Sequence, residues 1–156
     1  MKYALALLIC LLPPFAQALQ PGERLAPWTL LDQHDQPWTL SAQTRILLVA
    51  RDMDGARLVE AALAQRPRGY LQARDAVFVA DIQRMPAVIS TLFAIPAMRD
   101  YSYRVLLDRQ GRVASRYPGE KGAVTWLQLD QRTLVTQHDY TDAKALGAAL
   151  ERAPAH

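Results

Sequence analysis

The chain has 156 residues, of which 51% are hydrophobic and 21% are charged, and its formal net charge is +3 at pH 7. This length and composition indicate one globular domain and exclude collagen-like, low-complexity and charge-driven disordered chains. The mildly basic charge does not by itself identify a partner. The sequence contains a single cysteine, Cys10.

The first eighteen residues have the layout of a secretory signal peptide. Lys2 precedes an apolar run from Ala4 to Leu12, and Ala16-Gln17-Ala18 forms a small-x-small cleavage site. The run is shorter than a membrane span, which needs about 20 residues. We therefore predict export to the periplasm, cleavage after Ala18, and a mature domain at 19–156 that does not span the membrane.

The predicted cleavage would remove the single cysteine from the chain. Cys10 lies inside the signal segment, so the mature chain would contain no cysteine. Such a chain forms no disulfide and has neither a thiolate nucleophile nor a thiol ligand for a metal.

The first half of the mature chain predicts a hairpin followed by a buried strand. Residues 28–31 and 38–40 flank a polar turn at 32–37, which is typical of a β-hairpin. Ile46–Ala50 is a continuous apolar run and predicts a strand that is buried on both faces.

A helix is expected to begin near Asp54, and Asp52 or Asp54 is positioned to cap it. Pro67 and Gly69 end this helix, and a second buried strand follows at 76–80. The apolar residues of the helix recur at helical spacing: Leu58, Val59, Ala62 and Leu63.

The second half continues the alternation of helices and strands. Met85-Pro86 opens a second helix that Pro96 closes, and its apolar positions are Val88, Ile89, Leu92 and Phe93. A third strand is expected at 104–108 and a second hairpin at 124–129 and 133–136. The last helix starts near 141 and buries Leu146, Ala149 and Leu150.

This order of elements predicts one α/β domain with a mixed central sheet and helices on both faces. Strands separated by helices come first, and an antiparallel hairpin and a C-terminal helix follow. The thioredoxin-like fold has the same order.

Three segments resemble redoxin and peroxiredoxin-like proteins of the AhpC/TSA and TlpA type. Residues 25–30 with 35–40 are similar to the opening pattern APxFxL…DxxGxxxxL, and 105–114 are similar to vLLDxxGxvA. Residues 124–130 with 134–135 resemble the penultimate strand pair of these proteins. The resemblance covers nearly all of residues 20–152 and implies a thioredoxin-like fold.

The redox elements of that family are absent from this sequence. In redox members, the strand that ends near Ala50 leads to a nucleophilic cysteine at a helix N-terminus, where the dipole and free N–H groups stabilise a thiolate. The segment here is Arg51, Asp52, Met53, Asp54 and Gly55. The family's facing cis-proline is also missing, because the chain there reads Gly122, Ala123 and Val124. Thiol–disulfide oxidoreductase or peroxidase activity is therefore not expected.

Other candidate groups have two interpretations each. Asp52 and Asp54 suit acid–base chemistry or cation binding, but capping of a helix N-terminus is favoured. Met53 in this loop offers a soft ligand for Cu(I), although a packing role is favoured for the methionines.

The remaining polar patterns do not indicate a ligand. His34, His138 and His156 lack the spacing of a zinc site. A stretch of arginines and tyrosines at 99–117 resembles a nucleic-acid-binding pattern, but a solvated strand face is favoured and no nucleic-acid partner is expected.

The sequence thus predicts a non-catalytic binding or assembly protein of the periplasm, with no catalytic residue, metal or cofactor. Its partner would be an envelope protein or a small ligand. The expected binding surface is the loop Arg51–Gly55 together with the facing loop Gly122–Val124. The alternative is a metal-handling protein or a cysteine-independent enzyme that uses the Asp52-Met53-Asp54 loop.

Overall fold

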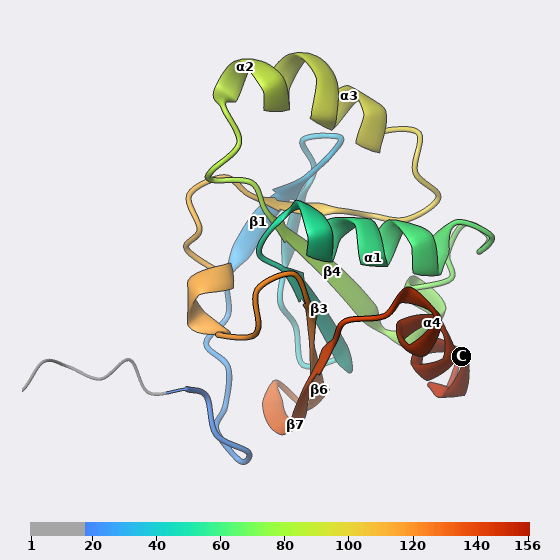
Figure 1. Ribbon diagram of the computed structural model, residues 1–156. Coiled ribbons are helices and arrows are strands. Elements are labelled where there is room, and N and C mark those ends of the chain that lie inside the picture. Colours follow the sequence, from blue (N-terminus) through green and yellow to red (C-terminus); the bar gives the residue numbers. More distant parts are fainter. Residues whose placement is uncertain (1–17) are drawn as a thin grey trace, which may run out of the picture.

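The strands with continuous apolar sequences lie at the centre of a seven-stranded sheet, as Figure 1 shows for the computed structural model. β3 (Ile46–Ala50) pairs in parallel with β4 (Ala76–Asp81), and every residue of β3 is buried. The structure describes residues 18–156. The predicted signal peptide, including Cys10, therefore lies outside the described residues apart from Ala18.

The strands are ordered β2-β1-β5-β4-β3-β6-β7. β1 (Thr29–Asp32) and β2 (Pro37–Thr39) form the expected hairpin at one edge. β6 (Val124–Asp130) and β7 (Thr133–Tyr140) form the second hairpin at the other edge. β5 (Leu106–Asp108) is parallel to β4 and antiparallel to β1, so the sheet is mixed, as predicted.

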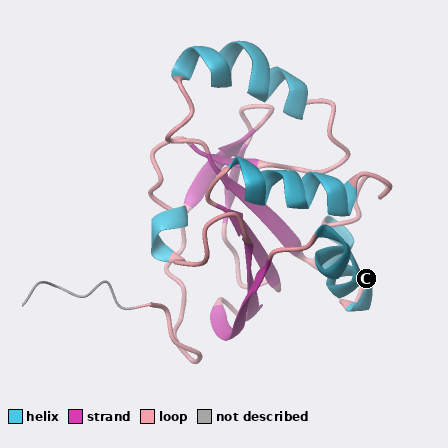
Figure 2. Ribbon diagram, viewed as in Figure 1, coloured by secondary structure: helices cyan, strands magenta, loops and turns pink. Residues whose placement is uncertain are grey.

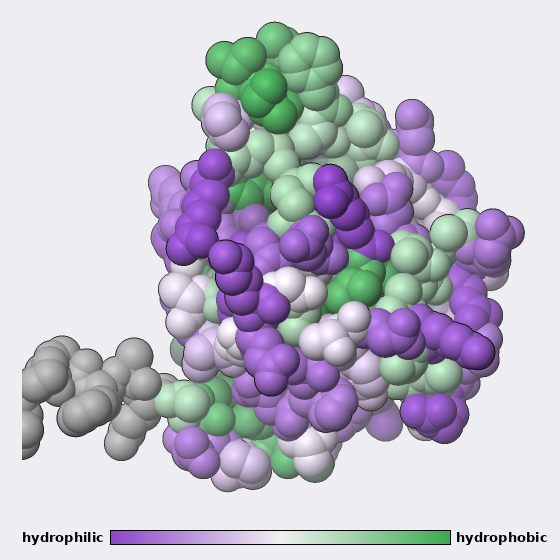
Figure 3. Space-filling view, in the orientation of Figure 1, coloured by the Kyte–Doolittle hydropathy of each residue, from purple (hydrophilic) through white to green (hydrophobic). Residues whose placement is uncertain are grey.

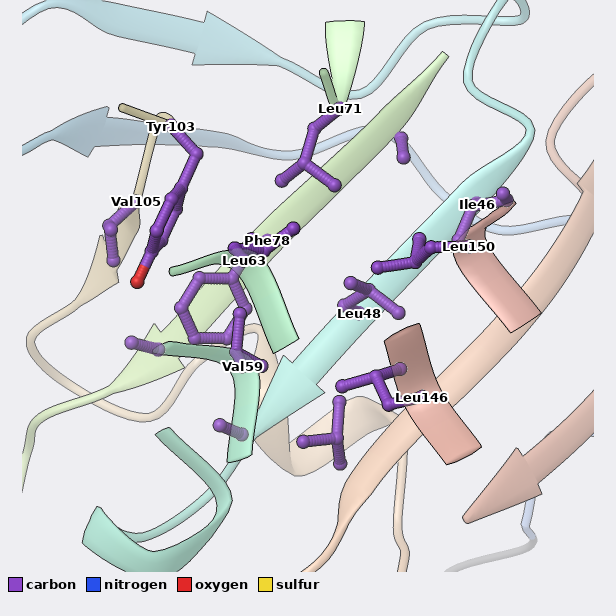
Figure 4. Close-up of a cluster of buried hydrophobic side chains, with 14 of the residues drawn as sticks. Ile46, Leu48, Val59, Leu63, Leu71, Phe78, Tyr103, Val105, Leu146 and Leu150 are labelled. Atoms are coloured by element: carbon purple, nitrogen blue, oxygen red, sulfur yellow. The ribbon is translucent and has the colours of Figure 1, made fainter. Parts of the chain in front are cut away.

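One face of the sheet carries the α-helices (Figure 2). α1 (Met53–Leu63) and α4 (Ala143–Arg152) pack against each other and against the sheet. Their apolar side chains form one buried cluster with the central strands, and Figure 4 labels Leu48, Val59, Leu63, Leu146 and Leu150 among its members.

The other face is covered by the N-terminal segment and by η3, a 3-10 helix at Ala114–Arg116. Trp28 lies in this layer and donates from Nε1 to the hydroxyl oxygen of Tyr117 at 2.8 Å. Both faces therefore carry helical structure, but the second face has one short turn where the first has full α-helices.

The second expected helix is interrupted. α2 (Ala87–Ile89) and α3 (Ile95–Met98) are joined by η2, a π-helical turn at Ser90–Ala94. Pro96 does not close the helix, because it lies in the first turn of α3, where a proline needs no N–H partner.

The apolar residues predicted for this helix do not pack on the sheet. They are among the most exposed large apolar residues of the described chain: Val88 at 63%, Ile89 at 46%, Leu92 at 62% and Phe93 at 64%. Figure 3 shows a hydrophobic patch over the α2–α3 segment. Helical spacing identifies an apolar face but does not show what covers that face. Because the π turn is wider than an α-helical turn, Ile95 points to the core in place of the four predicted residues.

Among residues 18–156, none of the helices combines the length and the apolar character needed to cross a bilayer.

Two substitutions distinguish the core from the α2–α3 patch. Leu127→Ala should lower the free energy of unfolding by about 2–5 kcal/mol, because Leu127 is fully buried. Phe93→Ala should change it by less than about 0.5 kcal/mol, because the Phe93 ring is exposed. Urea denaturation of residues 19–156 measures both values. A loss for Phe93→Ala as large as that for Leu127→Ala would contradict the exposed position of the patch.

Candidate functional site

The loop between β3 and α1 is organised by the carboxylate of Asp52. Asp52 is the N-cap of α1, and its Oδ1 accepts a hydrogen bond from the backbone N–H of Gly55 at 2.8 Å. This bond satisfies one of the N–H groups that the first turn of a helix leaves without a partner. Of the two aspartates expected to cap the helix, Asp52 makes the contact.

The same carboxylate holds the facing loop. Oδ2 of Asp52 accepts a hydrogen bond from the backbone N–H of Gly122 at 2.7 Å. Gly55 also lies against this loop, since a Cβ placed on Gly55 would be 2.5 Å from the carbonyl oxygen of Ala123. The two segments that the family resemblance places opposite each other are therefore in contact, and only glycine fits at position 55.

The backbone donors favour the ionised form of Asp52. Burial alone would raise the pKa of this carboxyl, but hydrogen bonds from the N–H groups of Gly55 and Gly122, a further backbone contact at Asp54 and the charge of Lys121 outweigh it. The pKa of Asp52 is therefore below its ordinary value, and the loop carries a permanent anion at the N-terminus of α1.

Arg51 connects this loop to the outer hairpin. Its Nη1 donates to Oγ1 of Thr125 at 2.7 Å, and the Thr125 hydroxyl donates to Oδ1 of Asp139 at 2.5 Å. Burial lowers the pKa of Arg51, although Asp139, Asp52 and Asp81 oppose the shift. The Nη2 atom of Arg51 is buried and has no hydrogen-bond partner among the described residues.

The other two members of the Asp52-Met53-Asp54 loop are largely exposed. Asp54 is exposed and lies 3.6 Å from the guanidinium of Arg57, and Met53 is 52% exposed. Asp52 and Asp54 thus have separate partners and do not form a carboxylate pair through shared contacts. No group of three histidine, cysteine, aspartate or glutamate side chains within residues 18–156 is arranged to hold a metal ion.

The histidines are dispersed over the fold. His34 lies in the exposed turn of the first hairpin, and His138 packs edge-on against Tyr140 with ring centroids 4.6 Å apart. Nε2 of His156 lies 3.7 Å from Oδ2 of Asp75. The structure therefore does not bring these three residues together.

A cleft of about 470 Å³ lies beside the Asp52 loop, between α1 and the α2–α3 segment. Its floor includes Phe78 of β4 and Val105 before β5, and Figure 4 shows both beside Tyr103. The rings of Tyr101 and Tyr103 stack in its wall with centroids 5.0 Å apart. All three methionines of the described chain also line the cleft: Met53, Met85 and Met98.

The tyrosines of the cleft wall stay neutral at physiological pH. Burial raises the pKa of Tyr103, and the neighbouring Tyr101 and Glu60 raise it further. Burial also raises the pKa of Tyr101, again with help from Glu60. The stacked rings therefore present an uncharged aromatic surface.

Reasoning from the sequence identified the loop at one end of this cleft but not the cleft itself. The signal available was the excess of apolar residues in 85–98, which supply Met85, Ile89 and Met98 to the cleft and still leave an exposed patch.

Comparison with solved structures assigns the fold. A peroxidoxin, BcpB from Mycobacterium tuberculosis, aligns over 86% of this chain and 97% of its own with 19% identity and a TM-score of 0.54. A putative thiol:disulfide interchange protein, DsbE from Chlorobium tepidum, aligns over 87% and 99% with 18% identity and a TM-score of 0.57. A thio-disulfide isomerase from Thermus thermophilus aligns over 88% and 99% with 22% identity and a TM-score of 0.53.

These similarities confirm the predicted thioredoxin-like fold. No protein-family model matches the sequence, and no curated protein matches it.

Replacing Asp52 tests the contribution of its charge. Ionised Asp52 stabilises the folded chain at pH values above its unfolded pKa of about 3.9, and this stability is lost as the pH falls through the lower folded value. Asp52→Asn should therefore cost about 1 kcal/mol of unfolding free energy at pH 7, because the amide is uncharged and its single oxygen cannot accept from both Gly55 and Gly122. The difference from wild type should shrink below about pH 4.

Urea denaturation across this pH range provides the measurement, and Asp54→Asn is the matched control. Asp54 is exposed, so its substitution should cost less than about 0.5 kcal/mol. A pH-independent difference between wild type and Asp52→Asn would show that the charge of Asp52 is unimportant.

Proposed function

We propose that this chain is a non-catalytic binding protein of the periplasm, exported by cleavage after Ala18, which holds its ligand in the cleft between α1 and the α2–α3 segment. The observation that carries the proposal is the position of this cleft. It opens directly beside Asp52, which stands where the resembled redox family keeps its nucleophile.

The cleft is better suited to recognition than the facing loop alone. The backbone N–H of Gly122 already donates to Asp52, so this donor is not available to an extended peptide. The cleft is concave and most of its lining residues are apolar, as in small-molecule sites, and the others are charged: Arg51, Asp52, Arg57, Glu60, Asp81 and Arg84. Its methionines adapt their shape to a bound group.

Thiol chemistry has no support in the residues of the domain. Residues 18–156 contain no cysteine, and the Asp52 carboxylate that replaces the thiolate accepts two backbone hydrogen bonds without offering a redox-active atom. The proposed role is therefore to bind and release a ligand unchanged. No contact within the described residues favours the alternative in which Asp52, Met53 and Asp54 handle a metal.

A bulky residue in the cleft should block binding. Ala56 lines the cleft from α1, whereas Ala61 on the same helix is exposed and does not line it. Ala56→Trp should weaken binding of the uncharged apolar fluorophore N-phenyl-1-naphthylamine at least tenfold, and Ala61→Trp should leave it within twofold. Fluorescence titration measures both affinities, with circular dichroism to verify folding. Equal affinities for the two variants would contradict the proposed site.

The mature chain should also be inactive toward disulfides. Purified residues 19–156 are expected to leave the rate of insulin precipitation by dithiothreitol unchanged, because the chain supplies no thiol. Acceleration above the dithiothreitol background would overturn the non-catalytic assignment.

A further inference from the structure

The apolar cleft continues into a second, more polar cleft of about 450 Å³. Four residues line both clefts: Arg51, Asp52, Asp81 and Arg84. The combined groove crosses the carboxyl ends of β3 and β4, the edge at which open α/β sheets bind their ligands. It has an apolar half under the α2–α3 segment and a polar half toward Lys121.

The carboxylates where the two halves meet already have hydrogen-bond donors. Both oxygens of Asp52 accept from backbone N–H groups, those of Gly55 and Gly122. Both oxygens of Asp81 accept from Gln83, one from its backbone N–H at 3.0 Å and one from its side-chain Nε2 at 2.8 Å. These two acids are therefore satisfied within the chain.

The cations around the same point have fewer partners, although Nη1 of Arg51 donates to Thr125 and its charge faces Asp52, Asp81 and Asp139. Nη2 of Arg51 is buried without a hydrogen-bond partner among the described residues. Arg84 and Lys121 line the polar half, and neither forms an ion pair or a side-chain hydrogen bond within residues 18–156. An anionic group placed here would receive charge-assisted hydrogen bonds.

The apolar half reaches the surface through Ile89. This residue lines the cleft and is also 46% exposed, so it connects the cleft to the exposed side chains of Val88, Leu92 and Phe93 (Figure 3). Residues 85–98 contain no charged residue. A helical segment that is apolar on both faces is normally covered by other apolar material.

We propose that the groove binds a single-chain amphipathic anion, with its hydrocarbon tail in the apolar cleft and its anionic head between Arg51, Arg84 and Lys121. This inference rests on the proposed binding function and specifies its ligand. The apolar cleft, at about 470 Å³, lies within the range of small-molecule sites. The second half has three cations, Arg51, Arg84 and Lys121, against two carboxylates, Asp52 and Asp81. A mainly apolar half followed by a half with an excess of positive charge matches the order of tail and head in such a molecule.

The test compares head groups on one tail. Isothermal titration calorimetry of residues 19–156 with decanoate, decanol and decyltrimethylammonium isolates the contribution of the head. Decanol is kept below its solubility limit and the two ionic ligands below their micelle-forming concentrations. Decanoate should bind at least tenfold more tightly than decanol, and the ammonium compound should bind more weakly than either. Octanoate should bind roughly fifteenfold more weakly than decanoate, because each buried methylene contributes about 0.8 kcal/mol.

A further ligand distinguishes two sources of the anion. Decyl phosphate carries the same tail on a phosphate head. Tighter binding of decyl phosphate than of decanoate would assign the site to a lipid phosphate, and the reverse would assign it to a free fatty acid. Either result supports an amphipathic anion.

Variants of the cationic half complete the test. The double variant Arg84→Gln with Lys121→Gln should weaken decanoate binding about tenfold and leave decanol binding unchanged. Arg68→Gln is the matched control, because Arg68 is exposed and lines neither half of the groove. Neither Arg84 nor Lys121 is buried, so these substitutions leave the core intact.

The outcomes separate this inference from the proposed function. Equal affinities of the wild type for decanoate and decanol, or a double variant that binds decanoate as tightly as the wild type, would overturn the inference. Preference for an acidic peptide over all the single-chain ligands would also overturn it. The binding function itself would still stand if Ala56→Trp abolished fluorophore binding, and would fail only if that variant had no effect.

Discussion

The arrangement of the candidate site depends on the two hydrogen bonds that the Asp52 carboxylate accepts. Its two oxygens join the first turn of α1 to the loop before β6, through the N–H groups of Gly55 and Gly122. A helix N-terminus attracts an anion because its N–H groups and its dipole point outward. Here the chain supplies that anion itself, so α1 and the facing loop are held together without a ligand.

The proposed recognition surface is the cleft beside this loop, because both Asp52 oxygens already accept hydrogen bonds. The groups that the proposal uses are the exposed cations Arg84 and Lys121 and the apolar wall below α2–α3. The proposed site therefore lies at the edge of the thioredoxin-like scaffold where the resembled redox family has its nucleophile. In the resembled redox family this edge of the sheet carries a reactive thiolate. Here it carries a carboxylate whose two oxygens already accept hydrogen bonds, beside an apolar groove.

Local signals in the sequence were sufficient for most of the fold. The uninterrupted apolar run Ile46–Ala50 predicted the buried central strand, and Asp52 was one of two expected caps for α1. The α2–α3 segment could not be predicted in the same way, because its π turn and the exposure of Phe93 depend on tertiary packing. The facing loops followed from the family resemblance, but the hydrogen bond from Gly122 to Asp52 joins residues 70 positions apart and has no local signal.

The most direct test of this account is the thiol pKa of an Asp52→Cys variant of residues 19–156. Residues 19–156 contain no other cysteine, so the absorbance of the thiolate as a function of pH reports on this position alone. If the Gly55 and Gly122 N–H groups form an anion site, the thiol pKa should lie well below the ordinary value of about 8.5. A pKa at or above about 8.5 would contradict the account, because it would show that this helix N-terminus does not stabilise an anion.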